Sequence, residues 1–436
     1  MNKFYHIVTY GCQMNVHESE KIAGILSGMG YESCDFPEQA DIVVFNTCCI
    51  RENAENHAFG NIGMLKKLKH AKKDMIIAVG GCLPQQMNKA ENLHEKFPYV
   101  DIIFGTHNLH DLQSLIEKKR RQKKTVIEIE DSEGEICEED KPLRTSYPNA
   151  WVNIMYGCNN FCSYCIVPYV RGRERSRLPE DILREVEELK RDGVREVMLL
   201  GQNVNSYSGG GLDFAGLLRE VDAIGVERIR FMTSHPKDLS DALIDVMANS
   251  RHICHQLHLP VQHGSDRVLE AMNRRYTAAH YLGLVDKLRC AMPDIGLTTD
   301  LIVGFPGETE DDFKATLDLV ERVRYDSAYT FIFSPRQGTV AASMPNQVDE
   351  ETSRRRIHEL IAVQERITGE IYAGQAGRIE RVLVEGPAAR GEGKLAGRTE
   401  RGITVNFTGT ASEGELVDVK ILGAGHNTLK GEQVGS

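Results

Sequence analysis

The 436-residue sequence predicts an α/β protein made of three successive domains. They are a parallel-sheet domain of flavodoxin or Rossmann type, an incomplete TIM-like (βα)6 barrel and a small OB-like β-barrel. Strand-like runs alternate with helical stretches up to about residue 370, and short, glycine-punctuated β-prone runs follow. An acidic, irregular stretch interrupts the alternation and indicates a linker. We therefore expect domains at 1–127, 148–370 and 371–436, with the linker at 128–147.

The composition is that of an ordinary soluble protein, with 41% apolar and 26% charged residues. No apolar run approaches the roughly 18 residues that cross a bilayer, and the opening MNKFYHIVTYGC is too short and too soon polar for a signal peptide. We expect a cytoplasmic protein whose eleven cysteines stay reduced. The net charge of −11 argues against a purely electrostatic hold on nucleic acid, although a local basic face stays possible.

The first domain repeats a strand, a cysteine and a helix. Its strand-like runs lie at 4–10, 41–46 and 75–79, with helical stretches at 18–29 and 52–69. A cysteine lies at an equivalent position shortly after each run: Cys12, Cys48 and Cys82. The separations, 48−12 = 36 and 82−48 = 34 residues, are close to the length of one βαβ unit.

Parallel strands end at a common edge of their sheet, so Cys12, Cys48 and Cys82 should converge. A single cysteine of this kind is more often an inert buried thiol. Three at equivalent positions indicate the ligands of an iron–sulfur cluster with one iron left open. Cys49 would point the other way in an extended chain. The other cysteines outside the loop described below lack this register and are expected to be structural: Cys34, Cys137, Cys254 and Cys290.

The second domain again alternates strands and helices. The expected strands are 152–155, 196–200, 228–231, 256–259, 296–303 and 328–333. The expected helices include 179–192, 238–248, 265–272, 278–291 and 310–323. Six βα repeats fit an incomplete TIM-like barrel, whose active site lies at the carboxyl ends of its strands.

Three cysteines follow the first of these strands: Cys158, Cys162 and Cys165. Their C-x3-C-x2-C spacing has no fourth ligand nearby, whereas structural zinc takes four. Three thiolates on a cubane would leave one iron open, and Gly157 permits the tight loop they need. A redox-labile cysteine cluster or part of a split zinc site is the alternative.

Polar residues follow several barrel strands. Gln202 and Asn203 lie on the active-site rim, where they could contact a cofactor or cap the next helix. The GFPGE stretch at 304–308 shapes a loop before a helix that begins at Thr309. No carboxylate is evident beside His258 or His263, so neither is expected to be catalytic.

Alternate arginines follow the cysteine loop, from Arg171 to Arg177, and would share one face of an extended segment. That face could hold a carboxylate or RNA phosphates, or could be a solvated rim.

The last domain has β-prone runs at 380–385, 395–398, 403–407 and 416–422, spaced as in a small OB-like barrel. A basic groove with a stacking platform is expected from Lys394, Arg398, Arg401 and Phe407. Residues 371–436 contain eight lysines and arginines and eight aspartates and glutamates, so this domain is neutral overall. Any binding of RNA must therefore come from the arrangement of the charges.

Three stretches carry a family resemblance. The C-x3-C-x2-C loop, with Tyr164 before its last cysteine, resembles the signature of radical S-adenosylmethionine (SAM) enzymes. The phrases TYGCQMNVHESE, VFNTCCIRENAE and AVGGCLPQQ resemble the amino-terminal domain of the methylthiotransferase branch. GKLAGRTERGITVNFTG resembles a TRAM domain, an RNA-binding module of tRNA-modifying enzymes. The resemblance covers the whole chain.

The resemblance implies two 4Fe-4S clusters and SAM as cofactors. Cys158, Cys162 and Cys165 would hold the cluster that cleaves one SAM to a 5′-deoxyadenosyl radical, with Tyr164, Gln202 and Asn203 at the cofactor. Cys12, Cys48 and Cys82 would hold the cluster that delivers sulfur. A second SAM would methylate the sulfide held on this cluster.

The implied reaction adds a methylthio group to carbon 2 of isopentenyl-adenosine at position 37 of tRNA, beside the anticodon. The implied partners are the tRNA anticodon stem-loop, an electron donor such as flavodoxin or ferredoxin, and a sulfur donor. A monomer without membrane contact is expected. Three rivals stay open: action on threonylcarbamoyl-adenosine in tRNA, action on an aspartate of a ribosomal protein, and a non-catalytic iron–sulfur protein that binds RNA.

Overall fold

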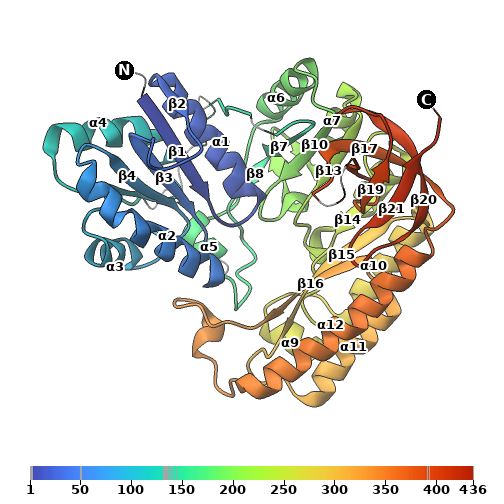
Figure 1. Ribbon diagram of the computed structural model, residues 1–436. Helices are drawn as coiled ribbons and strands as arrows, with labels where there is room; N and C mark the ends of the chain where they lie inside the picture. The colour runs from blue at the N-terminus through green and yellow to red at the C-terminus, as the bar shows by residue number, and fades with distance from the viewer. Residues whose placement is uncertain are drawn as a thin grey trace. The chain divides into compact units, whose positions relative to one another are not determined.

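The computed structural model describes residues 3–49, 52–130, 136, 138, 141–144, 146–389, 391 and 393–435 (Figure 1). Its contacts divide the chain into two compact units. The first unit comprises residues 1–145, 155–161 and 165–175; the second comprises residues 146–154, 162–164 and 176–436. Within the described residues, no helix has the length and apolar character needed to cross a membrane.

The first unit contains a six-stranded parallel sheet with strand order β2-β1-β3-β4-β5-β6. The strands are β1 (Lys3–Thr9), β2 (Tyr31–Ser33), β3 (Ile42–Thr47), β4 (Ile76–Gly81), β5 (Ile102–Phe104) and β6 (Val126–Glu128). The helices are α1 (Gln13–Gly28), α2 (Glu52–Ala71), α3 (Lys89–Lys96) and α4 (Leu112–Gln122). The order of its first five strands is that of a flavodoxin-like sheet, as predicted.

Both faces of this sheet are covered by helices, with α1 and α4 on one side and α2 and α3 on the other (Figure 1). Successive side chains of β3 point to opposite faces of the sheet, so they pack into two different cores. Ile42 and Val44 pack into the core under α1 and α4, whereas Val43 and Phe45 pack into the core under α2 and α3. A central strand buried on both faces is apolar throughout, which explains the continuous apolar run in the sequence.

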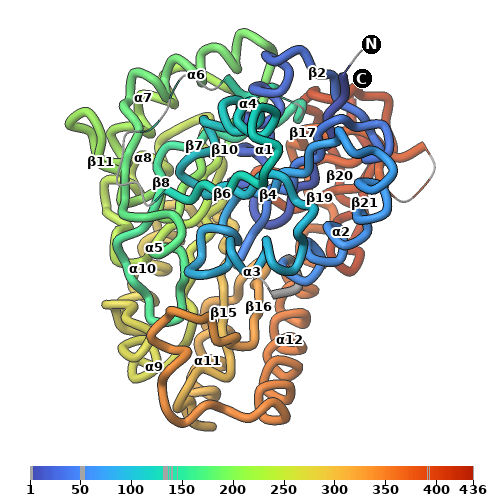
Figure 2. The backbone as a smooth tube through the Cα atoms, turned by 90° about the vertical axis from the view of Figure 1, so that its left-hand side faces the viewer, coloured from blue at the N-terminus to red at the C-terminus, as the bar shows by residue number. Residues whose placement is uncertain are grey.

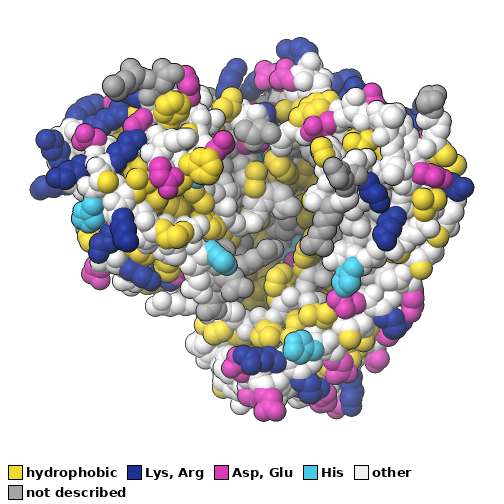
Figure 3. Space-filling model, in the orientation of Figure 1, with side chains coloured by type: hydrophobic (Ala, Val, Ile, Leu, Met, Phe, Trp, Pro, Cys, Tyr) yellow, Lys and Arg dark blue, Asp and Glu magenta, His cyan; other side chains and the backbone are white. Residues whose placement is uncertain are grey.

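Lysines and arginines gather on the first unit over α4 (Figure 3). Several of them are paired within the unit: Lys118 with Glu128, Lys119 with Asp101, and Arg121 with Glu117. Basic residues in the last turn of a helix also interact favourably with its dipole. This basic patch is therefore explained by the local structure of α4.

The second unit contains six parallel strands in two three-stranded sheets, β7-β10-β13 and β14-β15-β16. They are β7 (Asn149–Asn153), β10 (Glu196–Leu200), β13 (Arg228–Phe231), β14 (Gln256–His258), β15 (Gly296–Val303) and β16 (Ser327–Ile332). A single bridge between Ile229 and Ile253 links the two sheets. The predicted open (βα)6 barrel is confirmed.

The helices of this barrel are α6 (Pro179–Arg191), α7 (Phe214–Ile224), α8 (Asp241–Asn249), α9 (Asp266–Ala271), α10 (Ala278–Ala291), α11 (Glu310–Val323) and α12 (Glu350–Ala373). The long α12 runs beside β16 and leads into the carboxy-terminal barrel (Figure 2). A small hairpin is formed by β11 (Ser208–Gly209) and β12 (Leu212–Asp213). The segment after β7 carries β8 (Met155–Tyr156), α5 (Val167–Arg171) and β9 (Arg175–Ser176). The sequence did not predict α7 or α12.

Five strands close the carboxy-terminal barrel in the order β17-β18-β19-β21-β20. They are β17 (Ile379–Pro387), β18 (Leu395–Arg398), β19 (Thr404–Thr408), β20 (Leu416–Ala424) and β21 (Leu429–Gln433). The last strand was missed because LKGEQ has little β-prone character. The apolar core of the carboxy-terminal barrel is small and includes Val382, Val405, Phe407 and Val419.

Two arginines of β13 attach the carboxy-terminal barrel to the (βα)6 barrel. Arg228 donates to the backbone oxygens of Arg381 and Arg398, both at 2.6 Å. The buried Arg230 donates to the backbone oxygens of Thr399 at 2.7 Å and Glu400 at 2.8 Å, and pairs with Glu196 at 2.9 Å. Backbone carbonyls inside a protein need such partners, so these arginines hold the two barrels together.

Replacing Arg230 by glutamine should strongly destabilise the second unit. Glu196 would then lie buried without its cationic partner, a change that costs about 3–5 kcal/mol. The matched control is Arg195→Gln, because the Arg195–Glu227 pair is about 40% exposed and should contribute at most about 1 kcal/mol. Chemical denaturation measures both, and equal effects of the two variants would contradict this role of Arg230.

Candidate active site

The three cysteine loops of the first unit pack against one another at the carboxyl edge of its sheet. Cys12 occupies the N-cap position of α1, and Cys48 and Cys82 follow β3 and β4. A Cβ on Gly11 would lie 2.6 Å from Cβ of Cys48, and one on Gly81 would lie 2.5 Å from the backbone oxygen of Thr47. Both glycines have positive φ, so no other residue fits these turns without strain. Adjoining loops place the three thiols in one region of the unit.

Cys49 is not turned away from this region, which corrects the expectation drawn from strand alternation. Its completely buried thiol is hydrogen-bonded to the thiol of Cys82, and the two pack with Ile166 and Val170. β3 ends at Thr47, so the alternating directions of a strand no longer apply two residues later. The hydrogen bond with Cys49, assisted by Arg171 and opposed by burial, lowers the pKa of Cys82 to about 7.

A buried ion pair lies beside these cysteines. Nη1 of Arg171 is 2.5 Å from Oε1 of Glu18, and Nη2 donates to Oδ1 of Asn15 at 3.3 Å. The same Asn15 oxygen accepts from the Cys12 thiol at 3.5 Å, and Arg171 also hydrogen-bonds Cys82. A fixed positive charge therefore contacts the region where cysteine thiolates are predicted.

The arginines after the cysteine loop do not share one face, contrary to the prediction for an extended segment. Arg171 lies in the short helix α5, and the guanidinium of Arg173 lies 4.4 Å from the ring centre of Phe161. Arg177 is buried, with Nη1 donating to Glu185 at 2.7 Å and to the backbone oxygen of Asn153 at 2.6 Å. The segment is not extended throughout, because Arg171 ends α5 and Gly172, with φ of +73°, turns the chain before the short strand β9.

The residues of the first trio fit an iron–sulfur cluster by their chemistry. Thiolates are the ligands that these clusters take, and the three loops that carry them adjoin. Within the part of the chain that the structure describes, no three cysteine, histidine or acidic side chains are grouped to hold a single metal ion. A cubane separates its ligand sulfurs more widely than a single ion does, so the two observations are compatible.

The second cysteine loop is held by backbone hydrogen bonds and one close contact. Cys158 and Cys162 are buried, and Cys165 is partly buried. In the first unit, Cys158 N donates to the Gly172 oxygen at 3.1 Å, and a Cβ on Gly157 would lie 2.0 Å from the Arg173 oxygen. Gly157, with φ of +75°, is therefore required in this turn.

Cys162, in the second unit, accepts a hydrogen bond from an arginine that the sequence did not single out. Nη1 of Arg274 lies 3.4 Å from the Cys162 sulfur. The adjacent Ser163 is fixed by its N–H, which donates to the Met272 oxygen at 3.1 Å, and by its hydroxyl, which donates to Ala271. Cys162 and Ser163 are thus held by the end of α9 and the segment that follows it. Arg274 is 112 residues from Cys162, and no local sequence signal marks it.

Asn203 occupies the predicted rim, and its amide is engaged within the protein. Its Nδ2 donates to Asp238 at 2.8 Å, and its Oδ1 accepts from His235 N at 3.1 Å. Gln202 lies beside it, partly buried, and Tyr164 packs against an apolar cluster that includes Val268. Asn203 therefore joins the loops after β10 and β13, and cofactor contact by these three residues stays a prediction.

Two buried polar atoms at the end of β13 lack a hydrogen-bond partner among the described residues, Oγ of Ser234 and Nε2 of His235. Burial, assisted by the charges of Arg274 and Lys237, lowers the pKa of His235 to about 2, so the imidazole is neutral. Its Nδ1 accepts from Lys237 N at 3.2 Å, which places the proton on Nε2. A hydroxyl and an N–H are thus available to a polar ligand after this strand end.

Two histidines do have carboxylate neighbours, which corrects the prediction that none was near. Nε2 of His258 lies 3.6 Å from Asp300, and Nε2 of His263 lies 3.5 Å from Glu308. The partners lie on or after β15, more than 40 residues away, and so were not evident from the sequence. His263 and Glu308 are completely buried and hold the loop after β15.

The four residues of the predicted RNA groove are not all at the surface of the carboxy-terminal barrel. Phe407 is completely buried in the barrel core, so its ring has no free face on which a base could stack. Arg401 pairs with Asp326 of the (βα)6 barrel. Lys394 is exposed, and Arg398 is partly exposed with Glu385 at 3.2 Å. The prediction for Phe407 is wrong because alternate residues of β19 face inward.

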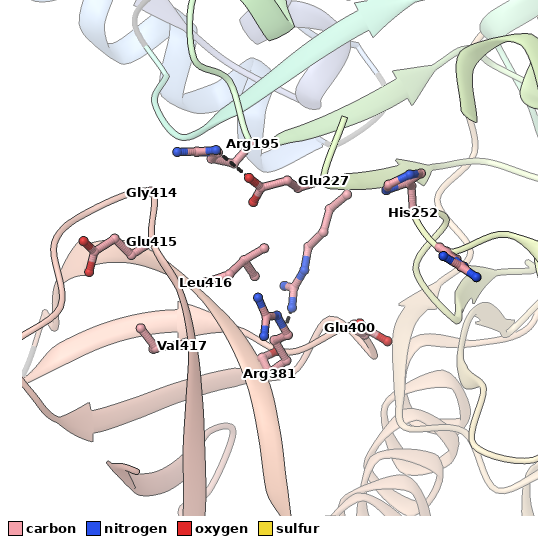
Figure 4. A pocket seen from close by; sticks show the side chains of 11 residues that line it. Arg195, Glu227, His252, Arg381, Glu400, Gly414, Glu415, Leu416 and Val417 are labelled. Atoms are coloured by element: carbon pink, nitrogen blue, oxygen red, sulfur yellow. Dashed lines mark hydrogen bonds and ion pairs between the residues drawn. The ribbon is translucent and has the colours of Figure 1, made fainter. Parts of the chain in front are cut away.

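A cavity of about 550 Å³ lies where the two barrels of the second unit meet (Figure 4). Its lining includes Arg195 and Glu227, which are paired with each other on the (βα)6-barrel side, and Arg381 and Glu400 of the carboxy-terminal barrel. Arg195 and Glu227 precede β10 and β13, so this cavity lies at the amino ends of the strands, away from the cysteine loop. Barrel enzymes carry their chemistry at the other end.

Three family descriptions match the chain. The radical SAM superfamily matches residues 152–320, the uncharacterized protein family UPF0004 matches residues 4–105, and the TRAM domain matches residues 375–434. The chain is 54% identical over 424 residues to the tRNA-2-methylthio-N(6)-dimethylallyladenosine synthase of Carboxydothermus hydrogenoformans, covering 96% of each chain. It is 52% identical to the enzyme of that name from Thermoanaerobacter sp., covering 99% of this chain and 93% of that one.

Solved structures share the fold at low identity. The radical SAM methyltransferase TsrM of Kitasatospora setae, solved with cobalamin and a 4Fe-4S cluster, matches with a TM-score of 0.58 and 16% identity, over 78% of this chain and 77% of that one. The cobalamin-dependent radical SAM enzyme OxsB matches with a TM-score of 0.54 and 13% identity, over 84% of this chain and 56% of that one.

Phe407→Ala should lower the free energy of unfolding by about 3–5 kcal/mol, because it leaves a cavity in the small barrel core. Phe407→Leu keeps most of the apolar volume and should leave RNA binding unchanged. Denaturant unfolding and RNA-binding titrations at one salt concentration measure the two effects. Loss of RNA binding in a stable Phe407→Leu protein would show that the ring contacts RNA after all.

Proposed function

The chain belongs to the family of tRNA-2-methylthio-N(6)-dimethylallyladenosine synthases, which are radical SAM methylthiotransferases, and we propose that it methylthiolates carbon 2 of isopentenyl-adenosine at position 37 of tRNA. The observation that carries this proposal is the pair of cysteine trios, one at the carboxyl edge of a flavodoxin-like sheet and one directly after the first barrel strand. Relatives that bear this enzyme name align over nearly the whole chain.

Cys158, Cys162 and Cys165 are proposed to hold the cluster that binds SAM. The thiols of Cys158 and Cys162 are shielded from solvent, and the carboxyl ends of the barrel strands are where such enzymes work. Ser234 and His235 offer a hydroxyl and an N–H at that end, and Tyr164, Gln202 and Asn203 lie in the cluster loop and the loop after β10. These groups suit the amino, carboxylate and ribose groups of SAM.

Cys12, Cys48 and Cys82 are proposed to hold the second 4Fe-4S cluster. When bound, the two clusters supply reductive cleavage of SAM and a site for the sulfur that is transferred. The protein contributes the glycine turns that bring the cysteine loops together and the cation of Arg171 beside Cys12 and Cys82. A nearby cation favours the anionic form of a thiol or sulfide ligand.

The target base must leave its stack to be reached, which the single-stranded anticodon loop allows. Lys394 and Arg398, on a barrel that matches the TRAM domain, are proposed to contact tRNA phosphates. We place the domains at 1–127, 148–370 and 371–436. A reduced electron donor such as flavodoxin or ferredoxin and a sulfur donor complete the reaction, carried out by a monomer in the cytoplasm where tRNA is available.

Replacing Cys12, Cys48 and Cys82 together by alanine should uncouple the two uses of SAM. The reconstituted variant should keep about four of eight irons and still form 5′-deoxyadenosine, because the other cluster has its own ligands. Methylthio transfer to tRNA should vanish. Both products are measured in one anaerobic assay, and methylthiolation by the triple variant would contradict the assignment.

Cys49→Ala is the matched control, because Cys49 contacts Cys82 but lies outside the trio. It should retain about eight irons and both activities. Loss of the second cluster in Cys49→Ala, with the cluster retained in Cys48→Ala, would move the ligand role to Cys49.

The double variant Lys394→Gln, Arg398→Gln should weaken tRNA binding and flatten its dependence on salt. Each lost phosphate contact lowers the slope of log K against log salt by about 0.7–0.9. Lys420→Gln, Lys430→Gln is the matched control, since it removes two exposed charges from the same barrel. Equal slopes for the two variants would assign the effect to net charge alone.

A further inference from the structure

Arg274 holds one predicted cluster ligand from outside the cysteine loop. Its Nη1 donates to the sulfur of Cys162 at 3.4 Å, within the range of hydrogen bonds to sulfur. Arg274 is 5% exposed and follows α9, far from Cys162 in sequence. Nothing in the family resemblance concerns this residue, and the function proposed above does not use it.

The guanidinium is fixed on its remaining sides. Nη2 donates to the backbone oxygen of Pro260 at 2.9 Å, and Nε donates to the Tyr276 hydroxyl at 2.9 Å. That hydroxyl in turn donates to the Val261 oxygen at 2.8 Å. Because hydrogen bonds fix Nε and Nη2 of the planar guanidinium, Nη1 is directed toward the sulfur. The contact is therefore determined by the fold and is not an incidental contact of a mobile side chain.

The buried contact has a consequence for an iron–sulfur cluster. Reduction adds one negative charge, which spreads over the cluster and its thiolate ligands. A cationic donor on a ligand sulfur stabilises the reduced state more than the oxidised state, and hydrogen bonds to sulfur are a known determinant of cluster potential. Burial strengthens the effect because solvent does not screen the charge.

We propose that Arg274 is a positioning residue that raises the reduction potential of the cluster at Cys158, Cys162 and Cys165 through its hydrogen bond to Cys162. The proposal rests on the proposed function, because it requires a cluster at these cysteines. It assigns Arg274 a role in setting how readily an electron donor can reduce the enzyme.

A purely structural role is the competing account. Arg274 links the loop after β14 to Tyr276 and to the cysteine loop, and its loss could simply loosen that junction. A loosened junction would lower iron content or thermal stability. It would not lower the potential of a cluster that is still fully loaded.

The experiment measures the midpoint potential by electron paramagnetic resonance during a redox titration with dithionite. The full-length Cys12, Cys48, Cys82→Ala protein serves as the parent because it retains only the cluster of interest. In this parent, Arg274→Gln should reduce the equilibrium constant for reduction about tenfold or more, which is a fall of about 59 mV for one electron. Arg274→Lys keeps the positive charge but lacks the planar guanidinium. Its midpoint potential should therefore lie between those of the parent and of Arg274→Gln.

Arg275→Gln is the matched control, because Arg275 is the exposed neighbour of Arg274. It should leave the potential unchanged. A fully loaded Arg274→Gln protein with the parent's potential would overturn the proposal. If the Arg274→Gln protein holds no iron, the midpoint potential of Arg274→Lys tests the proposal instead. A potential below that of the parent supports the role of Arg274, and an equal potential refutes it. A parent without any cluster would contradict the proposed function and not the role of Arg274.

Discussion

Parallel strands end at a common edge of their sheet, and the chemistry of this protein depends on that constraint. In the first unit it brings together the loops of Cys12, Cys48 and Cys82, which are separated by about 35 residues each in sequence. In the second unit it places Cys162, which follows β7, at the same end as the polar loops after β10 and β13. The same property of parallel strands thus positions cysteines in two different architectures.

Buried arginines then fix what strand direction brings together. Arg171 contacts Glu18, Asn15 and Cys82, and Arg274 contacts Cys162. Arg230 does the same for the junction between the two barrels. Burying a charge is costly unless it is multiply hydrogen-bonded, and the planar guanidinium offers five donors in fixed directions. Each of these arginines therefore orients several partners at once.

The sequence predicted what local pattern and strand register determine. The helix that starts after Thr309 has the predicted bounds, because Thr309 and Asp312 form a capping box. The cysteine register of the first unit followed from strand spacing alone. The sequence did not reveal the contact between Cys49 and Cys82, the burial of Phe407, or the partners of His258 and Cys162. Those depend on where strands end and on pairings between distant segments, which no local pattern encodes.

The central claim is tested most directly by mass spectrometry of tRNA nucleosides from a strain that lacks this gene. The account predicts loss of the 2-methylthio form of isopentenyl-adenosine and accumulation of isopentenyl-adenosine itself. The intact gene should restore the modification, and a gene encoding Cys158→Ala should not. An unchanged isopentenyl-adenosine profile, or a loss confined to the threonylcarbamoyl-adenosine derivative, would contradict the account.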